Sequence, residues 1–325
     1  SAPRGGSSFP TKRTARGGRA PAGTGACCTA GVGQRLRRPA AAAAGNHRPR
    51  PGAGFATRRA LVVERPCSVD APGAWVAKRS GQSGGAHVRI LPRGGVLRAG
   101  EHAQRLVRGQ ALSAVFLASA REVLVTGYSE QRFAPIPTSP FRHAGAIALP
   151  SQGLSREIRE AVQQAVQGLT QALNLRGLCG IDFVLQPDGS WQLIELNARP
   201  PSSFDLHVSA RRMFAAHVAA CRDLPLPRLV PRAQCQAHVV YYAPSALRIP
   251  NSIDWPDWVV DQPKPNDRVP AGAPVCTVQA SGANMLDTQG RLQRRLDRLR
   301  GWLGDADRRL PLTSTEILAG EHTHE

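Results

Sequence analysis

The stretch 181-IDFVLQPDGSWQLIELNAR-199 determines the fold that we expect for this chain of 325 residues. Its pattern predicts two strands, and the tripeptide Pro187-Asp188-Gly189 predicts the turn that joins them. Asp182 and Glu195 then fall near facing positions of adjacent antiparallel strands. Asn197 follows Glu195 by two residues, so both side chains point to the same face of the sheet. The hairpin therefore gathers two carboxylates and one amide oxygen on one surface.

An all-oxygen group of this kind suits a hard cation. Mg²⁺ typically takes one or two carboxylates from the protein and completes its shell with phosphate and water. Arg199 lies two residues after Asn197 beside the same patch, where a guanidinium would stabilise negative charge that develops in a reaction. The alternative is a hairpin whose acidic residues are solvated on its outer face, and this pattern alone gives the two interpretations about equal weight.

A second cluster lies about a hundred residues earlier in the chain, where Lys78 precedes the glycine-rich run 81-GQSGGAH-87. A glycine-rich loop lets backbone N–H groups approach phosphate oxygens, and a neighbouring lysine adds positive charge. The run is not a Walker A loop, because GKS or GKT is absent. Taken alone it is better explained as a simple hairpin turn, and its position before the carboxylate pair is what favours phosphate binding.

The two clusters together resemble the ATP-grasp superfamily. The segments that carry the resemblance are 75-WVAKRSGQSGGAHV-88, the strands around 109-GQALSAVFLAS-119, 179-CGIDFVL-185 and 193-LIELNARP-200. The chain is most similar to the carboxylate–amine ligase and carbamoyl-phosphate-synthase-like branch, and more loosely similar to the tyramine–glutamate ligase-like proteins of one-carbon cofactor biosynthesis. The resemblance implies an α+β fold in which two α+β subdomains enclose ATP.

The resemblance also implies roles for individual residues. Lys78 and Arg199 are the implied catalytic residues: Lys78 would contact the α- and β-phosphates, and Arg199 would face the substrate carboxylate or the transferred phosphoryl group. Asp182, Glu195 and Asn197 would hold Mg²⁺, with Mn²⁺ as an alternative ion. A glycine loop over the β- and γ-phosphates and a hinge strand against adenine give the implied ATP-binding residues, which are Lys78, Gly81, Gln82, Ser83, Gly84, Gly85, Gln104, Leu106 and Val107.

The chain divides into four parts by composition. Of the first 60 residues, 42 are Ala, Gly, Pro or Arg, so this segment cannot bury enough apolar surface to offset the entropy of ordering. We therefore expect residues 1–73 to be disordered or not homologous to the family, 74–225 to be the ATP-grasp core, 226–305 to be a β-rich C-terminal region ending in a helix, and 306–325 to be a polar tail.

Three helices are expected from apolar residues at helical spacing or from local composition. They cover 155–173, 203–221 and 290–303, and in the third of them leucines recur along one face. His207 falls within the second expected helix, where a position on the helix surface is a better interpretation than a role in a substrate pocket.

The balance of charge favours an anionic partner at first sight, because 42 Lys and Arg face 23 Asp and Glu, for a net charge of +19. However, the first 75 residues hold 13 of these basic residues and only two acidic ones. The excess is almost all Arg, as is also expected from translation of a GC-rich coding sequence. Nucleic-acid binding through the N-terminal arginines therefore remains a minority hypothesis.

Other features of the composition restrict the environment. No run approaches the ~20 apolar residues that a bilayer requires, and the N-terminus has no apolar segment typical of a secretory signal. Seven cysteines occur without any C-x-x-C pair, so neither a zinc site nor a disulfide framework is indicated. Cys179 and Cys276 lie in apolar runs and are expected to be core thiols. These features favour a cytoplasmic protein without membrane partners.

The function expected from the resemblance is that of an ATP- and Mg²⁺-dependent ligase, which activates a small carboxylate as an acyl phosphate for attack by an amine. ATP and that carboxylate are the expected partners, and a homodimer is left open. ATP-grasp enzymes usually carry a Rossmann-like domain before the glycine loop, and here residues 1–73 occupy its place. The alternative functions are therefore a truncated or inactive ATP-binding remnant and a basic nucleic-acid-binding protein.

Overall fold

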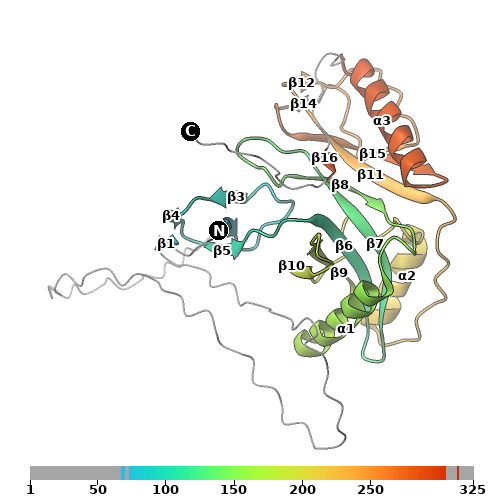
Figure 1. Ribbon diagram of the computed structural model, residues 1–325. Helices are drawn as coiled ribbons and strands as arrows, with labels where there is room; N and C mark the ends of the chain where they lie inside the picture. Colours follow the sequence, from blue (N-terminus) through green and yellow to red (C-terminus); the bar gives the residue numbers. More distant parts are fainter. Residues whose placement is uncertain (1–66, 70–72, 305–312, 315–325) are drawn as a thin grey trace, which may run out of the picture.

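A computed structural model describes residues 67–69, 73–304 and 313–314 (Figure 1). The segment 1–73, expected to be disordered or non-homologous, and the tail 306–325 lie outside the described residues, except for 67–69, 73 and 313–314. The described elements are, in chain order, β1 (Cys67–Val69), β2 (Trp75–Arg79), β3 (Val88–Leu91), β4 (Gly95–Leu97), β5 (Glu101–Arg105), β6 (Gln110–Ala118), β7 (Val123–Phe133), β8 (His143–Ala148), α1 (Arg156–Leu173), β9 (Gly177–Leu185), β10 (Trp191–Asn197), α2 (Ala210–Cys221), β11 (Cys235–Tyr242), β12 (Leu247–Arg248), β13 (Val259–Val260), β14 (Arg268–Val269), β15 (Pro274–Gly282), α3 (Met285–Trp302) and β16 (Thr313–Ser314).

One large antiparallel sheet runs through most of the described chain. Its strands follow the order β10-β9-β6-β7-β8-β11-β15-β13, and β16 pairs with β7. The hairpin predicted from the stretch 181–199 is present as β9 and β10 at one edge of this sheet. Strands β11 and β15, which come from the expected C-terminal region, continue the same sheet beyond β8. The expected core and the β-rich region are thus joined by backbone hydrogen bonds.

Helices α1 and α2 cover opposite faces of the sheet. Alternate residues of β6 point to opposite faces; one series, including Phe116, packs with α1, and the other, including Leu117, packs with α2. The first helix agrees with its prediction: it begins after Ser155, whose hydroxyl accepts a hydrogen bond from the Ile158 N–H, and its Val162 and Val166 are buried.

The second expected helix, 203–221, is wrong in its first part, because α2 starts only at Ala210. The segment before it forms turns, and Leu206 and Val208 are both buried in it, against different clusters of the core. Side chains two residues apart point about 200° apart around a helix, so a helical segment would not bury these two in those clusters. Tertiary burial therefore overrides the local helical pattern.

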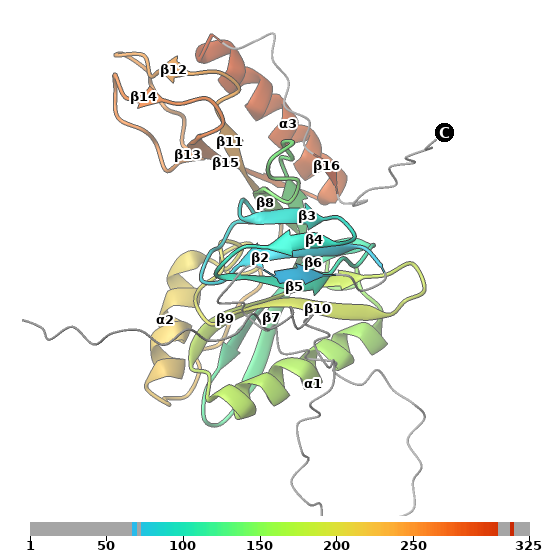
Figure 2. The ribbon, with the colours of Figure 1, turned by 90° about the vertical axis from the view of Figure 1, so that its left-hand side faces the viewer.

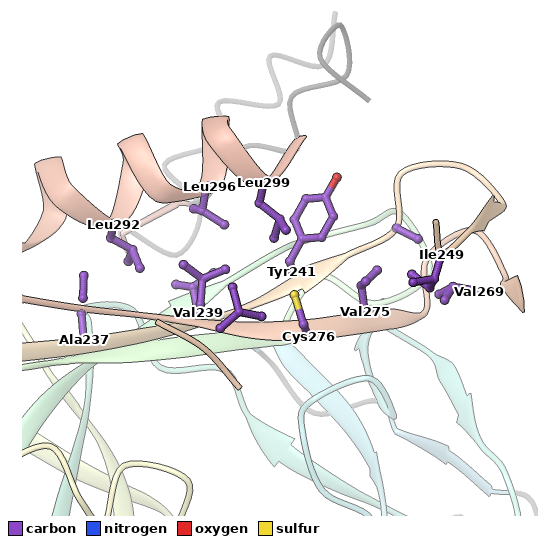
Figure 3. Packing of buried hydrophobic residues seen from close by; sticks show 14 of the residues in the cluster. Ala237, Val239, Tyr241, Ile249, Val269, Val275, Cys276, Leu292, Leu296 and Leu299 are labelled. Atoms are coloured by element: carbon purple, nitrogen blue, oxygen red, sulfur yellow. The ribbon is translucent and has the colours of Figure 1, made fainter. Parts of the chain in front are cut away.

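The C-terminal helix α3 lies along β11 and β15 (Figure 1). Figure 3 shows Leu292, Leu296 and Leu299 of this helix above Val239 and Tyr241 of β11. The apolar stripe is as predicted, but the helix starts five residues before the expected boundary at 290, because the Asn284 side chain accepts a hydrogen bond from the Asp287 N–H at 2.9 Å.

A second, three-stranded sheet with the order β3-β2-β5 lies next to the β9–β10 hairpin (Figure 2). Its Gln104 side chain donates a hydrogen bond to the Ile194 carbonyl of β10 at 3.1 Å, which fixes the two sheets together at this point. Cys179 and Cys276 are buried thiols, as predicted. Among the helices in the described part of the chain, none combines the length and hydropathy needed to cross a bilayer.

Candidate functional site

A cavity of about 350 Å³ lies between the small sheet and the large one. Most of the residues singled out from the sequence line it, although they come from parts of the chain a hundred residues apart. They are Lys78, Ser83, Gly84, Gly85, Gln104, Leu106, Val107, Asp182, Glu195, Asn197 and Arg199. Gly81 and Gln82 do not line the cavity. The geometry therefore brings the two sequence clusters together, and the roles of the individual residues stay predictions.

The carboxylate pair sits at the register that the sequence predicts. Glu195 is the direct partner of Asp182 across β9 and β10, next to an irregularity in β10 between Leu193 and Glu195. The Asn197 side-chain amide donates to one oxygen of Asp182 at 3.1 Å. This hydrogen bond uses the NH₂ group alone, so the amide oxygen of Asn197 keeps its lone pairs for a metal ion.

The environment of Asp182 favours a bound positive ion beside its carboxyl group. Burial, and then the negative charge of Glu195, raise the pKa of Asp182 to about 7. A carboxyl group with such a pKa is held in an unfavourable environment for its charged form, which a bound cation would reverse. A divalent cation therefore fits this pair.

The donors also match the preference of Mg²⁺. No group of three or more His, Cys, Asp or Glu side chains occurs among the described residues at a spacing that could hold a metal. The protein would thus supply two carboxylates and one amide oxygen, and leave the remaining positions to water or phosphate, as Mg²⁺ commonly requires.

Lys78 on β2 provides the positive side of the cavity. Burial lowers the pKa of Lys78, while the charges of Glu195 and Asp182 act in the opposite direction. It forms no ion pair within 4.0 Å with any other described residue. A partly buried ammonium group without a close counter-ion is suited to bind an anionic group of a ligand.

The glycine-rich loop is held against the segment before β8. Gly84 and Gly85 have positive φ angles of +76° and +72°, which glycine adopts without strain. A Cβ atom on Gly85 would lie 1.9 Å from the Phe141 carbonyl oxygen, so only glycine fits there. The His143 N–H donates to the Gly84 carbonyl at 2.9 Å. The loop therefore has a defined position and is not a free hairpin turn.

The expected hinge is formed by the end of β5 and the residues after it. The Leu106 N–H donates to the Ala74 carbonyl at 2.9 Å, and Val107 is buried. Gln104 is held by its bond to Ile194. This segment gives the cavity an apolar wall, which is suitable for a nucleobase.

Several lining residues were not found from the sequence. Gln131 of β7 donates its amide N–H to the second oxygen of Asp182 at 2.7 Å, so both oxygens of that carboxylate are held. His143 lines the cavity, and burial lowers its pKa to about 4. Gln131 lies on β7 and His143 on β8, and neither belongs to a sequence motif that would distinguish it from other sheet residues.

Two further histidines, His87 and His207, lie in different parts of the structure. His87, the last residue of the glycine-rich run, lines the cavity, and its pKa is lowered chiefly by burial. His207 does not lie on a helix surface as expected. It precedes α2, its ring packs over Gly127, and its Nε2 lies 3.3 Å from the Ser129 hydroxyl oxygen. It does not line this cavity, because the turns before α2 direct it to the neighbouring part of β7.

Comparisons with a family model and with solved structures support the fold that the sequence predicts. Residues 59–203 match the family model described as the ATP-grasp domain. Among curated proteins, no sequence matches this chain significantly. A solved structure with a similar fold is carboxyaminoimidazole ribonucleotide synthase from Aspergillus clavatus complexed with ATP, at 18% identity and a TM-score of 0.51, where the match covers 70% of this chain and 63% of that one.

Two further solved structures are similar. The L-amino acid ligase from Bacillus licheniformis is 14% identical, with a TM-score of 0.50, and the match covers 73% of this chain and 67% of that one. The biotin carboxylase domain dimer of the Hydrogenobacter thermophilus 2-oxoglutarate carboxylase, in complex with MgADP, ADP and bicarbonate, is 11% identical, with a TM-score of 0.53; 69% of this chain and 56% of that one are covered. This chain spans less than two thirds of the Aspergillus and Hydrogenobacter proteins, and at these identities the likeness concerns the fold.

Proposed function

We propose, from the premise that this chain contains an ATP-grasp domain, that it is an ATP- and Mg²⁺-dependent ligase that joins a carboxylate to an amine. The observation that carries the proposal is the cavity in which Lys78, the glycine loop and the Asp182–Glu195 pair meet. Solved proteins of the same fold hold ATP or ADP, and one of them is an amino acid ligase, which supports the same class of reaction.

The residues of the chain would act mainly by binding and by neutralising charge. Lys78 would bind phosphate oxygens from the floor of the cavity, and Ser83 to Gly85 would cover the terminal phosphates with backbone N–H groups. Asp182, Glu195 and Asn197 would hold Mg²⁺, which when bound neutralises phosphate charge and orients the polyphosphate.

Arg199 is the candidate for contact with the carboxylate substrate. It is exposed and lies two residues after the end of β10, where its guanidinium donates one hydrogen bond to the Pro200 carbonyl at 3.2 Å and retains other N–H groups. An exposed guanidinium beside a phosphate site can bind a substrate carboxylate and hold it next to the terminal phosphate.

The reaction would then have two steps. A carboxylate oxygen attacks the γ-phosphorus of ATP, the bond between that phosphorus and the bridging oxygen breaks, and ADP leaves. The amine next attacks the carbonyl carbon of the acyl phosphate, inorganic phosphate leaves, and the amine loses one proton. Both steps depend chiefly on position and electrostatics, which is what the described residues provide.

The test is the release of ADP by the purified chain with Mg²⁺, ATP, and a panel of small carboxylates and amines. Hydroxylamine in place of the amine would trap the acyl phosphate as a hydroxamate. We expect ADP release that depends on a carboxylate and is lost in Arg199→Ala. ATP binding without ADP release on any member of the panel would instead favour the inactive ATP-binding remnant.

A further inference from the structure

The segment from Ala134 to His143 connects the glycine loop with the C-terminal part of the sheet. On the loop side, three contacts are present. The His143 N–H donates to the Gly84 carbonyl at 2.9 Å, the Ser139 hydroxyl donates to the Ala86 carbonyl at 2.9 Å, and the Phe141 carbonyl packs directly on Gly85. The position of the loop over the cavity is therefore fixed by this segment.

The same segment is fixed on its other side by β11 and the turn before β15. The Tyr242 hydroxyl donates to the His143 carbonyl at 2.7 Å. The Arg142 guanidinium lies 3.9 Å above the Tyr242 ring and donates to the Gly272 carbonyl at 3.1 Å. His143 thus has its N–H bound to the glycine loop and its C=O bound to the C-terminal region.

Arg142 is an unusual residue in this position. Arg142 is only 4% exposed, and among the described residues it forms no ion pair within 4.0 Å. Its Nε donates to the Ala134 carbonyl at 2.8 Å, which joins the last part of the segment to its first residue. Its Nη1 donates to the Gly272 carbonyl, which attaches the segment to the C-terminal region. Burial of an unpaired guanidinium is costly, and it persists where several fixed acceptors and an aromatic face compensate it.

Neither Arg142 nor Tyr242 lines the cavity, although His143 and Phe141 between them and the loop do. A loop rich in glycine loses more conformational entropy on binding a ligand than a loop that is already held in place. A bond that fixes the neighbouring segment therefore lowers the cost of ordering the loop around phosphates.

We propose that Arg142 and Tyr242 are positioning residues, through which the strands β11 and β15 determine how tightly the glycine loop holds a polyphosphate. The inference rests on the proposed function for the identity of the ligand. It assigns a task to the C-terminal region that the sequence does not indicate, since residues 242 and 272 lie more than 150 positions after the loop.

Tyr242→Phe tests the inference with the smallest change. It removes the hydroxyl that binds the His143 carbonyl and leaves the ring under Arg142. We expect the dissociation constant for ATP with Mg²⁺, measured by calorimetry, to rise about three- to ten-fold, as for the loss of one hydrogen bond. The affinity for AMP should stay unchanged, because AMP lacks the β- and γ-phosphates that the loop would cover.

Two other variants complete the design. Tyr128→Phe is the matched control, since its hydroxyl binds the Arg159 carbonyl away from the cavity. Arg142→Lys keeps the charge but cannot reach both the Ala134 and Gly272 carbonyls from a planar group, and it should weaken ATP binding at least as much as Tyr242→Phe. Equal losses for ATP and AMP, or unchanged ATP binding in both variants, would overturn the inference.

Hydrogen exchange gives a readout that does not depend on the ligand. The His143 amide, bound to Gly84, and the amides of residues 81–88 should exchange at least three-fold faster in Tyr242→Phe than in Tyr128→Phe. Unchanged exchange in this region would overturn the inference even if ATP binds. Failure of the wild-type chain to bind ATP would contradict the proposed function, while the exchange rates would still decide whether Tyr242 positions the loop.

Discussion

Replacement of Gly85 by alanine is the substitution for which the structure gives the clearest magnitude. The new Cβ would lie 1.9 Å from the Phe141 carbonyl oxygen, whereas real contacts of this kind are not shorter than 3.0 Å. The two atoms must therefore separate by at least 1.1 Å. The φ angle of +72° adds strain of about 1–2 kcal/mol for any residue with a Cβ.

The loop can relieve the contact only by leaving Phe141. It would then lose its hydrogen bonds to His143 and Ser139, each of which contributes about 1 kcal/mol. Gly81 is the matched control, because its φ angle of +76° carries the same strain but nothing lies within 4 Å of its Cβ position. The two variants should therefore differ by about 2 kcal/mol in the free energy of ATP binding, or roughly 30-fold in affinity.

Calorimetric titration of each variant with ATP at fixed Mg²⁺ measures this difference. We expect both to bind more weakly than the wild type, and Gly85→Ala to bind about 30-fold more weakly than Gly81→Ala. Equal affinities in the two variants would refute the reasoning, because they would mean that the contact with Phe141 does not hold the loop in its binding position. A thermal denaturation of each variant checks that the fold itself is retained.

Three further predictions follow from other parts of the molecule. Glu195→Gln should lower the affinity for Mn²⁺, followed by its electron paramagnetic resonance signal, at least ten-fold, whereas the exposed Glu122→Gln should leave it unchanged; equal affinities would remove Glu195 from the metal site. Burial lowers the pKa of His238 to about 4, so the unfolded chain binds its proton first, and stability present above pH 6.5 is lost as the pH falls towards 4. Urea unfolding should lose about 2 kcal/mol at pH 5 through this residue, and His238→Gln should abolish that part of the loss; an unchanged pH dependence would contradict it. Leu296→Ala should lower the free energy of unfolding by about 2–5 kcal/mol because the side chain is 1% exposed, while Leu286→Ala, at 80% exposure, should change it by less than about 0.5 kcal/mol; similar values would contradict the packing in Figure 3.

The parts of the fold that were predictable are those in which local pattern and tertiary burial agree. The hairpin 181–199 has alternation and a turn signal that fit its place at the sheet edge, so even the pairing of Asp182 with Glu195 could be predicted. Helix α1 has one apolar stripe and one sheet face to cover. The start of α2 was wrong because Leu206 and Val208 pack into different clusters, which no local period reveals.

The candidate site, too, was predictable only where its residues belong to a recognisable local pattern. Lys78 and the two carboxylates stand out in the sequence by residue type and spacing, and the resemblance to a known family predicts that they line one cavity. Gln131, which holds Asp182, lies on β7, two strands away from β9 in the sheet order. Tyr242 reaches the loop through the His143 backbone, and the Arg142 side chain fixes the segment that carries Phe141 and His143. Contacts of this kind depend on sheet register over long separations, and a single sequence does not encode them in any local pattern.

The most direct test of the account is whether Lys78 and Glu195 bind ATP together with Mg²⁺. Calorimetry should be carried out on the wild type, on Lys78→Ala and Glu195→Ala, and on Lys264→Ala as a control, since Lys264 is exposed and outside the cavity. We predict that ATP binding requires Mg²⁺ and falls at least ten-fold in the first two variants but not in the control. ATP binding that stays intact in both Lys78→Ala and Glu195→Ala would contradict the account.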